Sequence, residues 1–296
     1  MGGLIWRGIL AERREFLRSL RRHSLLGSVH YITGIPGRRK SLVKRVLALP
    51  IEPFVLRVEE QRFKRSYRPL DWHTIAPDSP SAEEAAAHFK DRVEPRFFPG
   101  VSVMPRDVDT EDVDAIVAEA DSILDGHIRV LGVDIDAKSP VMWRCDPPSG
   151  KVWPKRYFKR LFPVANTVDN TDVKIAWELS RLNHLLTLGL AYRLTRDEKY
   201  ANALADQMDD WWEQNPYKTG VNWTLAMDVA MRSANMILGF YLSRESRAWT
   251  PAHTLRLVSS VQEHGEYVME NLENAGITSN HYLSNIAGLL YISEMF

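Results

Sequence analysis

The chain has little of what builds disulfide-bonded, metal-binding or membrane-spanning proteins. Its 296 residues include one cysteine, Cys145, which excludes a disulfide within the chain and a cysteine-rich metal site. No apolar run approaches the roughly 20 residues that a transmembrane helix needs, and Met1–Leu10 does not resemble a secretory signal peptide. Zinc-hydrolase, phosphate-loop and nucleic-acid-binding motifs are missing as well. We therefore expect no metal, no cofactor, no nucleic-acid partner and no transmembrane segment.

Positive charge is concentrated at the start of the chain, although the net charge is zero. Up to Pro50, arginine and lysine face only two acidic residues, Glu12 and Glu15. Such a segment can bind an anionic membrane, nucleic acid or an acidic polymer, but we favour the simpler interpretation of a solvated helix face. Residues 1–100 are predicted to form a basic arm with an irregular region, and residues 101–296 a helical domain.

Local signals predict two helices and one extended segment before the main helical region. Ser81 and Glu84 have the spacing of a capping box, which predicts a helix over Ser81–Lys90. Apolar residues at helical spacing predict a second helix over Thr110–Leu124. Gly126–Val133 has the character of a strand or an extended segment.

From Asp172 onward the sequence predicts five helices of alternating character. They are expected at about Asp172–Tyr192, Tyr200–Asn215, Asn222–Ser243, Thr250–Leu272 and Ser279–Phe296. The first, third and fifth are apolar on nearly every face, as buried helices are, whereas the second and fourth are amphipathic. Thr250 and Pro251 supply the N-cap and the first residue of the fourth helix.

This alternation predicts concentric layers, with apolar helices inside and amphipathic helices outside. Successive helical hairpins that bury their faces on one another form a solenoid, or a toroid if they curve enough. The last apolar helix has no following partner in the chain. We therefore expect an all-α fold, an incomplete (α/α) toroid of helical hairpins with a mixed, basic N-terminal arm.

Five groups of short motifs occur in a fixed order along the second half of the chain. They are WRCDPPSGKVWP at 143–154, DVKIAWELSR at 172–181, AYRLT and DEKY at 191–200, NP and GVNW at 215–223, and EHG and NHYL at 263–283. Each motif alone is weak, but together and in order they are specific. The region from about Val117 to the end thereby resembles the N-terminal helical domain of heparinase II/III-type polysaccharide lyases, a group that includes oligoalginate lyases.

The resemblance implies an acidic polysaccharide partner, a glycosaminoglycan or alginate, that is cut by β-elimination. In that family the helical domain packs on a C-terminal β-sandwich, and the sugar chain lies between them. The family's catalytic tyrosine lies on a later toroid helix. Residues 1–296 include neither that helix nor the sandwich, so we expect the toroid to be truncated before the sandwich. Tyr282 belongs to the NHYL motif and is not taken as the missing tyrosine.

Asn280 and His281 are the candidate catalytic residues. The resemblance gives the asparagine of the Asn-His motif the task of neutralising the uronate carboxylate. The chemistry agrees, because the C5 proton of a uronate is poorly acidic while the adjacent carboxylate is charged, and a neutral amide at a helix N-terminus can donate to that anion. His281 can add a hydrogen bond or act as the base. The alternative is that Asn280 only caps its helix.

Trp177, Trp223, Arg232 and Tyr282 are the candidate substrate-binding residues. Tryptophan faces can stack on sugar rings, and arginine binds carboxylates bidentately. Core packing is the favoured alternative for each tryptophan, and Asp228, one turn earlier on the same helix, is the alternative partner of Arg232.

Three functions are weighed. The first is a polysaccharide lyase acting on a uronate-containing glycan, and the second is a non-catalytic helical fragment that keeps only a glycan-binding groove. A glycoside hydrolase is a distant third, because it needs two carboxylates that face each other across a cleft. Glu178 and Asp228 are the only obvious pair on inner helices, and Glu178 is also expected to pair with Arg181.

Overall fold

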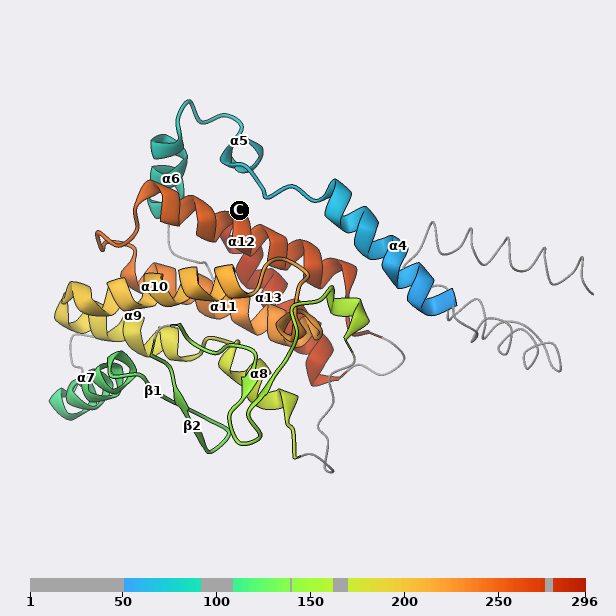
Figure 1. Cartoon of the computed structure of the whole chain (residues 1–296). Helices are drawn as coiled ribbons and strands as arrows, with labels where there is room; N and C mark the ends of the chain where they lie inside the picture. The colour runs from blue at the N-terminus through green and yellow to red at the C-terminus, as the bar shows by residue number, and fades with distance from the viewer. Residues whose placement is uncertain (1–50, 92–108, 139, 162–169, 275–278) are drawn as a thin grey trace, which may run out of the picture. The chain divides into compact units, whose positions relative to one another are not determined.

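The structure is a computed structural model that describes residues 51–91, 109–138, 140–161, 170–274 and 279–296 (Figure 1). By its contacts the chain divides into two compact units, Met1–Tyr67 and Arg68–Phe296. The described part of the first unit is helix α4 (Ile51–Ser66), and all other described elements belong to the second. The predicted basic arm up to residue 50 and the predicted domain boundary at residue 100 lie outside the described residues.

The second unit is built around two layers of helices. Its main helices are α8 (Val173–Leu179), α9 (His184–Thr195), α10 (Glu198–Gln214), α11 (Ala226–Ser243), α12 (Pro251–Glu270) and α13 (Asn280–Met295). Helix α11 packs between α9 and α13, while α10 lies against α9 and α12 lies against α11 (Figure 1). The apolar helices thus form the inner layer and the amphipathic ones the outer layer, which confirms the predicted all-α toroid arrangement.

Helix α11 is the centre of this arrangement. Most of its residues are buried, and Val229, Ala230 and Ile237 have no exposed surface. Small residues let α13 approach it closely, since a Cβ atom built on Gly288 would lie 2.6 Å from the Cβ of Ala230. Helix α13 is less enclosed than its apolar sequence predicts.

The capping signals identified the ends of the helices well. The Thr250 hydroxyl accepts a hydrogen bond from the backbone N–H of His253 at 3.2 Å, and Pro251 is the first residue of α12, as predicted. In the same way Ser81 accepts from the N–H of Glu84 at 3.2 Å, at the start of α6 (Ala82–Asp91).

Smaller elements cover the outside of the helical layers. Helix α6 packs on α12, and α5 (Trp72–Ile75) lies against the same helix. Helix α7 (Thr110–Leu124) has the predicted bounds and packs on α9. Two short 3-10 helices, η1 (Phe158–Arg160) and η2 (Val221–Trp223), lie in the connections. None of the described helices is long and apolar enough to cross a membrane.

Two short antiparallel hairpins precede the toroid helices. The segment Gly126–Val133, predicted to be extended, contains strand β1 (His127–Val130) and then a turn, after which β2 (Val133–Asp136) pairs with β1. Its two-residue turn has positive φ at both positions, 49° at Leu131 and 80° at Gly132, which suits the right-handed twist of a tight hairpin. The second hairpin pairs β3 (Cys145–Asp146) with β4 (Lys151–Val152).

The first toroid helix is interrupted, contrary to the sequence prediction. Helix α8 ends at Leu179 and α9 begins at His184, because Leu182 takes a left-handed conformation with φ 61°. The apolar periodicity hides this break, since the Leu182 side chain still has no exposed surface. The third predicted helix is also divided, into η2 and α11.

Candidate functional site

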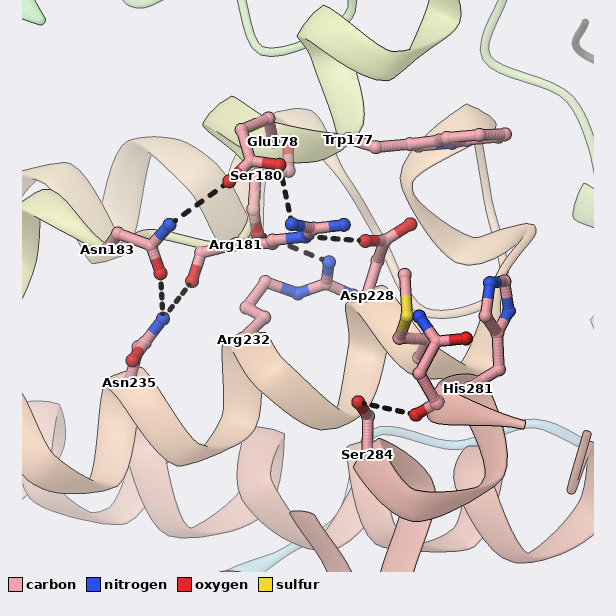
Figure 2. Close-up of polar contacts among 12 residues, drawn as sticks. Trp177, Glu178, Ser180, Arg181, Asn183, Asp228, Arg232, Asn235, His281 and Ser284 are labelled. Atoms are coloured by element: carbon pink, nitrogen blue, oxygen red, sulfur yellow. Dashed lines mark hydrogen bonds and ion pairs between the residues drawn. The ribbon is translucent and has the colours of Figure 1, made fainter. Parts of the chain in front are cut away.

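The α8–α9 break places one arginine between two carboxylates. Arg181 Nη1 lies 2.5 Å from Glu178 Oε2, as expected, and its Nε lies 2.8 Å from Asp228 Oδ1 on α11 (Figure 2). Asp228 is 1% exposed. Burial raises the pKa of the Asp228 carboxyl above its ordinary value, although the hydrogen bond from Arg181 acts in the opposite direction. Because Glu178 and Asp228 share one guanidinium, they do not face each other across an open cleft.

Two asparagines hold the backbone of the break. Asn235 Nδ2 on α11 donates to the carbonyl of Arg181 at 2.8 Å and to Asn183 Oδ1 at 2.7 Å. Asn183 Nδ2 in turn donates to Glu178 Oε1 at 3.4 Å. This network links the break to α11, so the position of the Arg181 side chain depends on both helices (Figure 2).

Arg232 belongs to the core rather than to an open site. It has no exposed surface, and its guanidinium carbon lies 4.2 Å from the ring centroid of Trp211 and 5.1 Å from that of Trp223. Its Nη1 donates to the carbonyl of Ser180 at 3.4 Å, which again supports the break. Burial lowers the pKa of Arg232 to about 9. The predicted contact between Arg232 and a substrate carboxylate is therefore corrected, because protein covers this guanidinium.

The side chain that accepts a hydrogen bond from Arg232 is a neutral histidine, not Asp228. Arg232 Nε donates to His264 Nε2 at 2.9 Å, and His264 Nδ1 lies 2.6 Å from the carbonyl oxygen of Ser260. A guanidinium can only donate and a carbonyl can only accept, so the imidazole proton is on Nδ1. Burial, with the nearby Arg232 charge, lowers the pKa of His264 well below its ordinary value. This pair ties α11 to α12 inside the core.

The two candidate tryptophans have different surroundings. Trp223 is 1% exposed and packs against Trp211, Tyr217 and Tyr267, so no face of its ring is open to a sugar, and core packing is its role here. Trp177 is only partly buried, and its Nε1 donates to the carbonyl of Val221 at 3.0 Å. Its stacking role stays a prediction, with a partly open ring to support it.

Asn280 is the first residue of α13, and Ser279 occupies the N-cap position. The Ser279 side chain makes no cap hydrogen bond. Among the described residues, none forms a hydrogen bond with the exposed Asn280 side chain. A helix-capping role for Asn280 would need a hydrogen bond from a backbone N–H of the first turn to its side chain, and that bond is not formed. Tyr282 lies in the first turn of the same helix, half-buried, and its substrate-binding role stays a prediction.

His281 is held by an acid that the sequence analysis did not identify. Its Nδ1 lies 2.9 Å from Oε1 of Glu273, in the loop between α12 and α13. Oε2 of the same carboxylate accepts from the backbone N–H of Met227 at 2.8 Å, in the first turn of α11. Nothing in the sequence indicated Glu273, because its partners lie on two different helices. In Figure 2, Trp177, Arg181, Asp228 and His281 surround one region at the start of α11 and α13.

A cleft of about 540 Å³ touches the Arg181 cluster but is not lined by Trp177, Asn280 or His281. It lies between α7, the β1–β2 hairpin and the start of α9, and it shares Glu178 and Asn183 with the Arg181 cluster. Its volume falls within the range of roughly 300–1,000 Å³ that is usual for ligand pockets. Within the described ranges, no group of three or more metal-ligating side chains is found.

Comparison with known proteins identifies the family. Residues 143–296, more than half of the chain, match the family model of the heparinase II/III N-terminus. A heparin-sulfate lyase from Pedobacter heparinus is 28% identical over 130 residues, which are 42% of this chain and 19% of that protein. The chain thus spans about a fifth of the length of this relative.

Solved structures agree at the level of the fold. The crystal structure of heparan sulfate lyase HepC from Pedobacter heparinus gives a TM-score of 0.51 at 21% identity, over 76% of this chain and 34% of that one. A HepC mutant gives a TM-score of 0.52 over 78% and 36%. Because the model of the heparinase II/III N-terminus matches more than half of the chain, the chain belongs to the heparinase II/III family.

Proposed function

We propose that the chain is the helical part of a polysaccharide lyase that cleaves a uronate-containing acidic glycan by β-elimination. The observation that carries the proposal is the pair Asn280 and His281 at the N-terminus of α13, next to the N-terminus of α11, in a domain of the heparinase II/III family. Helix N-termini favour bound anions, because their free N–H groups and dipoles carry partial positive charge. A uronate carboxylate is the anion that this family resemblance implies.

The chemistry assigns a separate task to each residue. The Asn280 amide donates to the substrate carboxylate and so lowers the energy of the developing negative charge. His281 Nε2 has no hydrogen-bond partner among the described residues and takes the C5 proton. The C5–H electron pair then forms the C4–C5 double bond, the C4–O4 bond breaks, and the leaving O4 takes a proton from a water molecule. Trp177 offers a ring face to a neighbouring sugar.

The acids around the site are paired within the protein. Glu178 and Asp228 both bind Arg181, and Glu273 binds His281 and the Met227 N–H. This pairing reduces their repulsion of an anionic substrate. It also disfavours a glycoside hydrolase, whose two carboxyl groups must both reach the sugar.

The test uses two substitutions of Asn280 in the complete enzyme, because residues 1–296 alone are expected to give little or no product. Asn280→Ala removes the donor and is expected to lower turnover of a uronate polymer by about 10²–10³-fold, and Asn280→Asp is expected to be as poor or worse because it adds a negative charge. Ultraviolet absorbance of the unsaturated uronate product measures turnover, with heparan sulfate as the first substrate because a relative is a heparin-sulfate lyase. The matched control Asn202→Ala, at an exposed position of α10, should leave turnover unchanged. Near-normal turnover by Asn280→Asp would contradict the assignment.

The second candidate is a glycan-binding domain without catalysis. It is favoured by the exposed Asn280 side chain and the partly buried Trp177 ring, which can contact a glycan without cleaving it. Binding of a uronate glycan that is weakened by Asn280→Ala, with no unsaturated product from the complete protein, would support this candidate against the lyase.

A further inference from the structure

We propose that Glu273 is a positioning residue, which fixes the proton of His281 on Nδ1 and presents the Nε2 lone pair to the substrate. The catalytic role of Glu273 rests on the function proposed above, whereas its contacts with His281 and Met227 do not. Glu273 lies in the α12–α13 connection and its side chain is 24% exposed. It acts on the reaction only through His281.

Both oxygens of the Glu273 carboxylate are in use. Oε1 lies 2.9 Å from His281 Nδ1, while Oε2 accepts from the Met227 N–H at 2.8 Å and from Asn285 Nδ2 at 3.4 Å. The Glu273 backbone is fixed as well, because its N–H donates to Asn285 Oδ1 at 2.9 Å. Three contacts therefore hold the carboxylate against the N-terminus of α11, where the helix dipole favours a negative charge.

The donors and acceptors determine the tautomer of His281. A backbone N–H can only donate, so the oxygen that faces Met227 must accept. An ionised carboxylate can only accept, so the imidazole nitrogen that faces Oε1 must carry the proton. In the neutral imidazole this leaves a lone pair on Nε2, as a general base requires.

Replacing the Glu273 carboxylate by an amide leaves one acceptor oxygen where two groups, the Met227 N–H and His281 Nδ1–H, each need an acceptor. In Glu273→Gln the single acceptor oxygen stays with the two donors, Met227 N–H and Asn285 Nδ2, and the amide NH₂ then faces His281 Nδ1. That nitrogen must now accept, so the proton moves to Nε2. If Glu273 were only a helix cap, kcat would stay unchanged in Glu273→Gln, because the glutamine oxygen still accepts from the Met227 N–H.

Nitrogen NMR of the imidazole rings in the 296-residue chain reads the tautomer directly. Spectra are recorded at about pH 8.5, where an ordinary histidine is neutral, and the His281 signals are identified by their loss in His281→Gln. The wild type should show the Nδ1–H form, Glu273→Gln the Nε2–H form, and Glu273→Ala a mixture. Glu270→Gln is the matched control, because Glu270 ends α12 and pairs with Lys218 at 2.6 Å, away from His281. It should leave the tautomer unchanged.

Turnover of the complete enzyme adds the functional readout. With the lone pair moved away from the substrate, Glu273→Gln should lower kcat by about 10²–10⁴-fold with KM nearly unchanged. An Nε2–H form in the wild type, the same tautomer in Glu273→Gln, or a changed tautomer with unchanged kcat would each overturn the positioning role. The expected tautomer change together with a complete enzyme that gives no product would refute the lyase proposal but support the Glu273–His281 arrangement.

Discussion

Gly288→Ala is expected to destabilise the chain by forcing α13 away from α11. The new Cβ atom would lie 2.6 Å from Ala230 Cβ and 2.8 Å from both the Cα and the carbonyl oxygen of Ala230. Two of these three atoms are backbone, so no side-chain rotation removes the overlap. Since carbon atoms normally pack at about 3.5–4.0 Å, the helices must separate by roughly 1 Å.

The magnitude follows from two opposing effects. Overpacking of a tight contact typically costs about 1–3 kcal/mol, while alanine gains about 1 kcal/mol over glycine in a helix interior. We expect a net loss of about 1–2 kcal/mol in the free energy of unfolding. Because α13 carries Asn280 and His281, the same shift should also lower any turnover.

Urea unfolding followed by circular dichroism measures this loss. Gly265→Ala on α12 is the matched control, since its Cβ would meet only the side chain of Ile292, at 3.2 Å. That side chain can move, so the control should be neutral or slightly stabilising. If Gly288→Ala is as stable as the wild type, the close approach of α11 and α13 is not as described.

Two further predictions concern buried ionisable groups. Arg181→Met removes the partner of Asp228, which is 1% exposed, and should lower the free energy of unfolding by about 3–5 kcal/mol. Adding Asp228→Asn should restore part of this loss, because no buried charge is then left unpaired. If urea unfolding shows that the effects of the two substitutions simply add, the two residues are not coupled. Burial lowers the pKa of His184 to about 4, so the unfolded chain binds its proton first as pH falls below about 6.5. Above about pH 6.5 the buried neutral His184 therefore makes its full contribution to the free energy of unfolding. As the pH falls towards 4, this contribution decreases by about 3 kcal/mol. Stability measured between these limits should depend less on pH in His184→Gln, and an equal dependence would refute the assignment.

Local signals account for the elements that the sequence predicted well. Thr250 and Pro251 specify the start of α12 through groups that lie next to each other in the chain. The alternation of apolar and amphipathic helices likewise needs no long-range information, because burial on all faces or on one face is visible in each helix alone. The Leu182 break was missed because a buried leucine fits the helical pattern in either conformation.

The site was less predictable because its contacts cross between helices. Sequence spacing suggested Asp228 as the partner of Arg232, but Asp228 binds Arg181 and Arg232 binds His264. Spacing within one helix could not show either contact. Asn280 and His281 were found from a motif, whereas Glu273 has no motif and is visible only through its contacts.

The left-handed Leu182 has a consequence for which residues this position can accept. Its conformation costs a non-glycine residue about 1–2 kcal/mol. Glycine would relieve that cost but leave a cavity in the core, and removing a buried leucine side chain costs about 2–5 kcal/mol. Asparagine accepts the backbone but brings an amide into an apolar site. None of these residues therefore suits both the left-handed backbone and the apolar core at position 182. Leu185 and Leu188 are equally buried but lie in regular helix, so leucine carries no such conformational cost there.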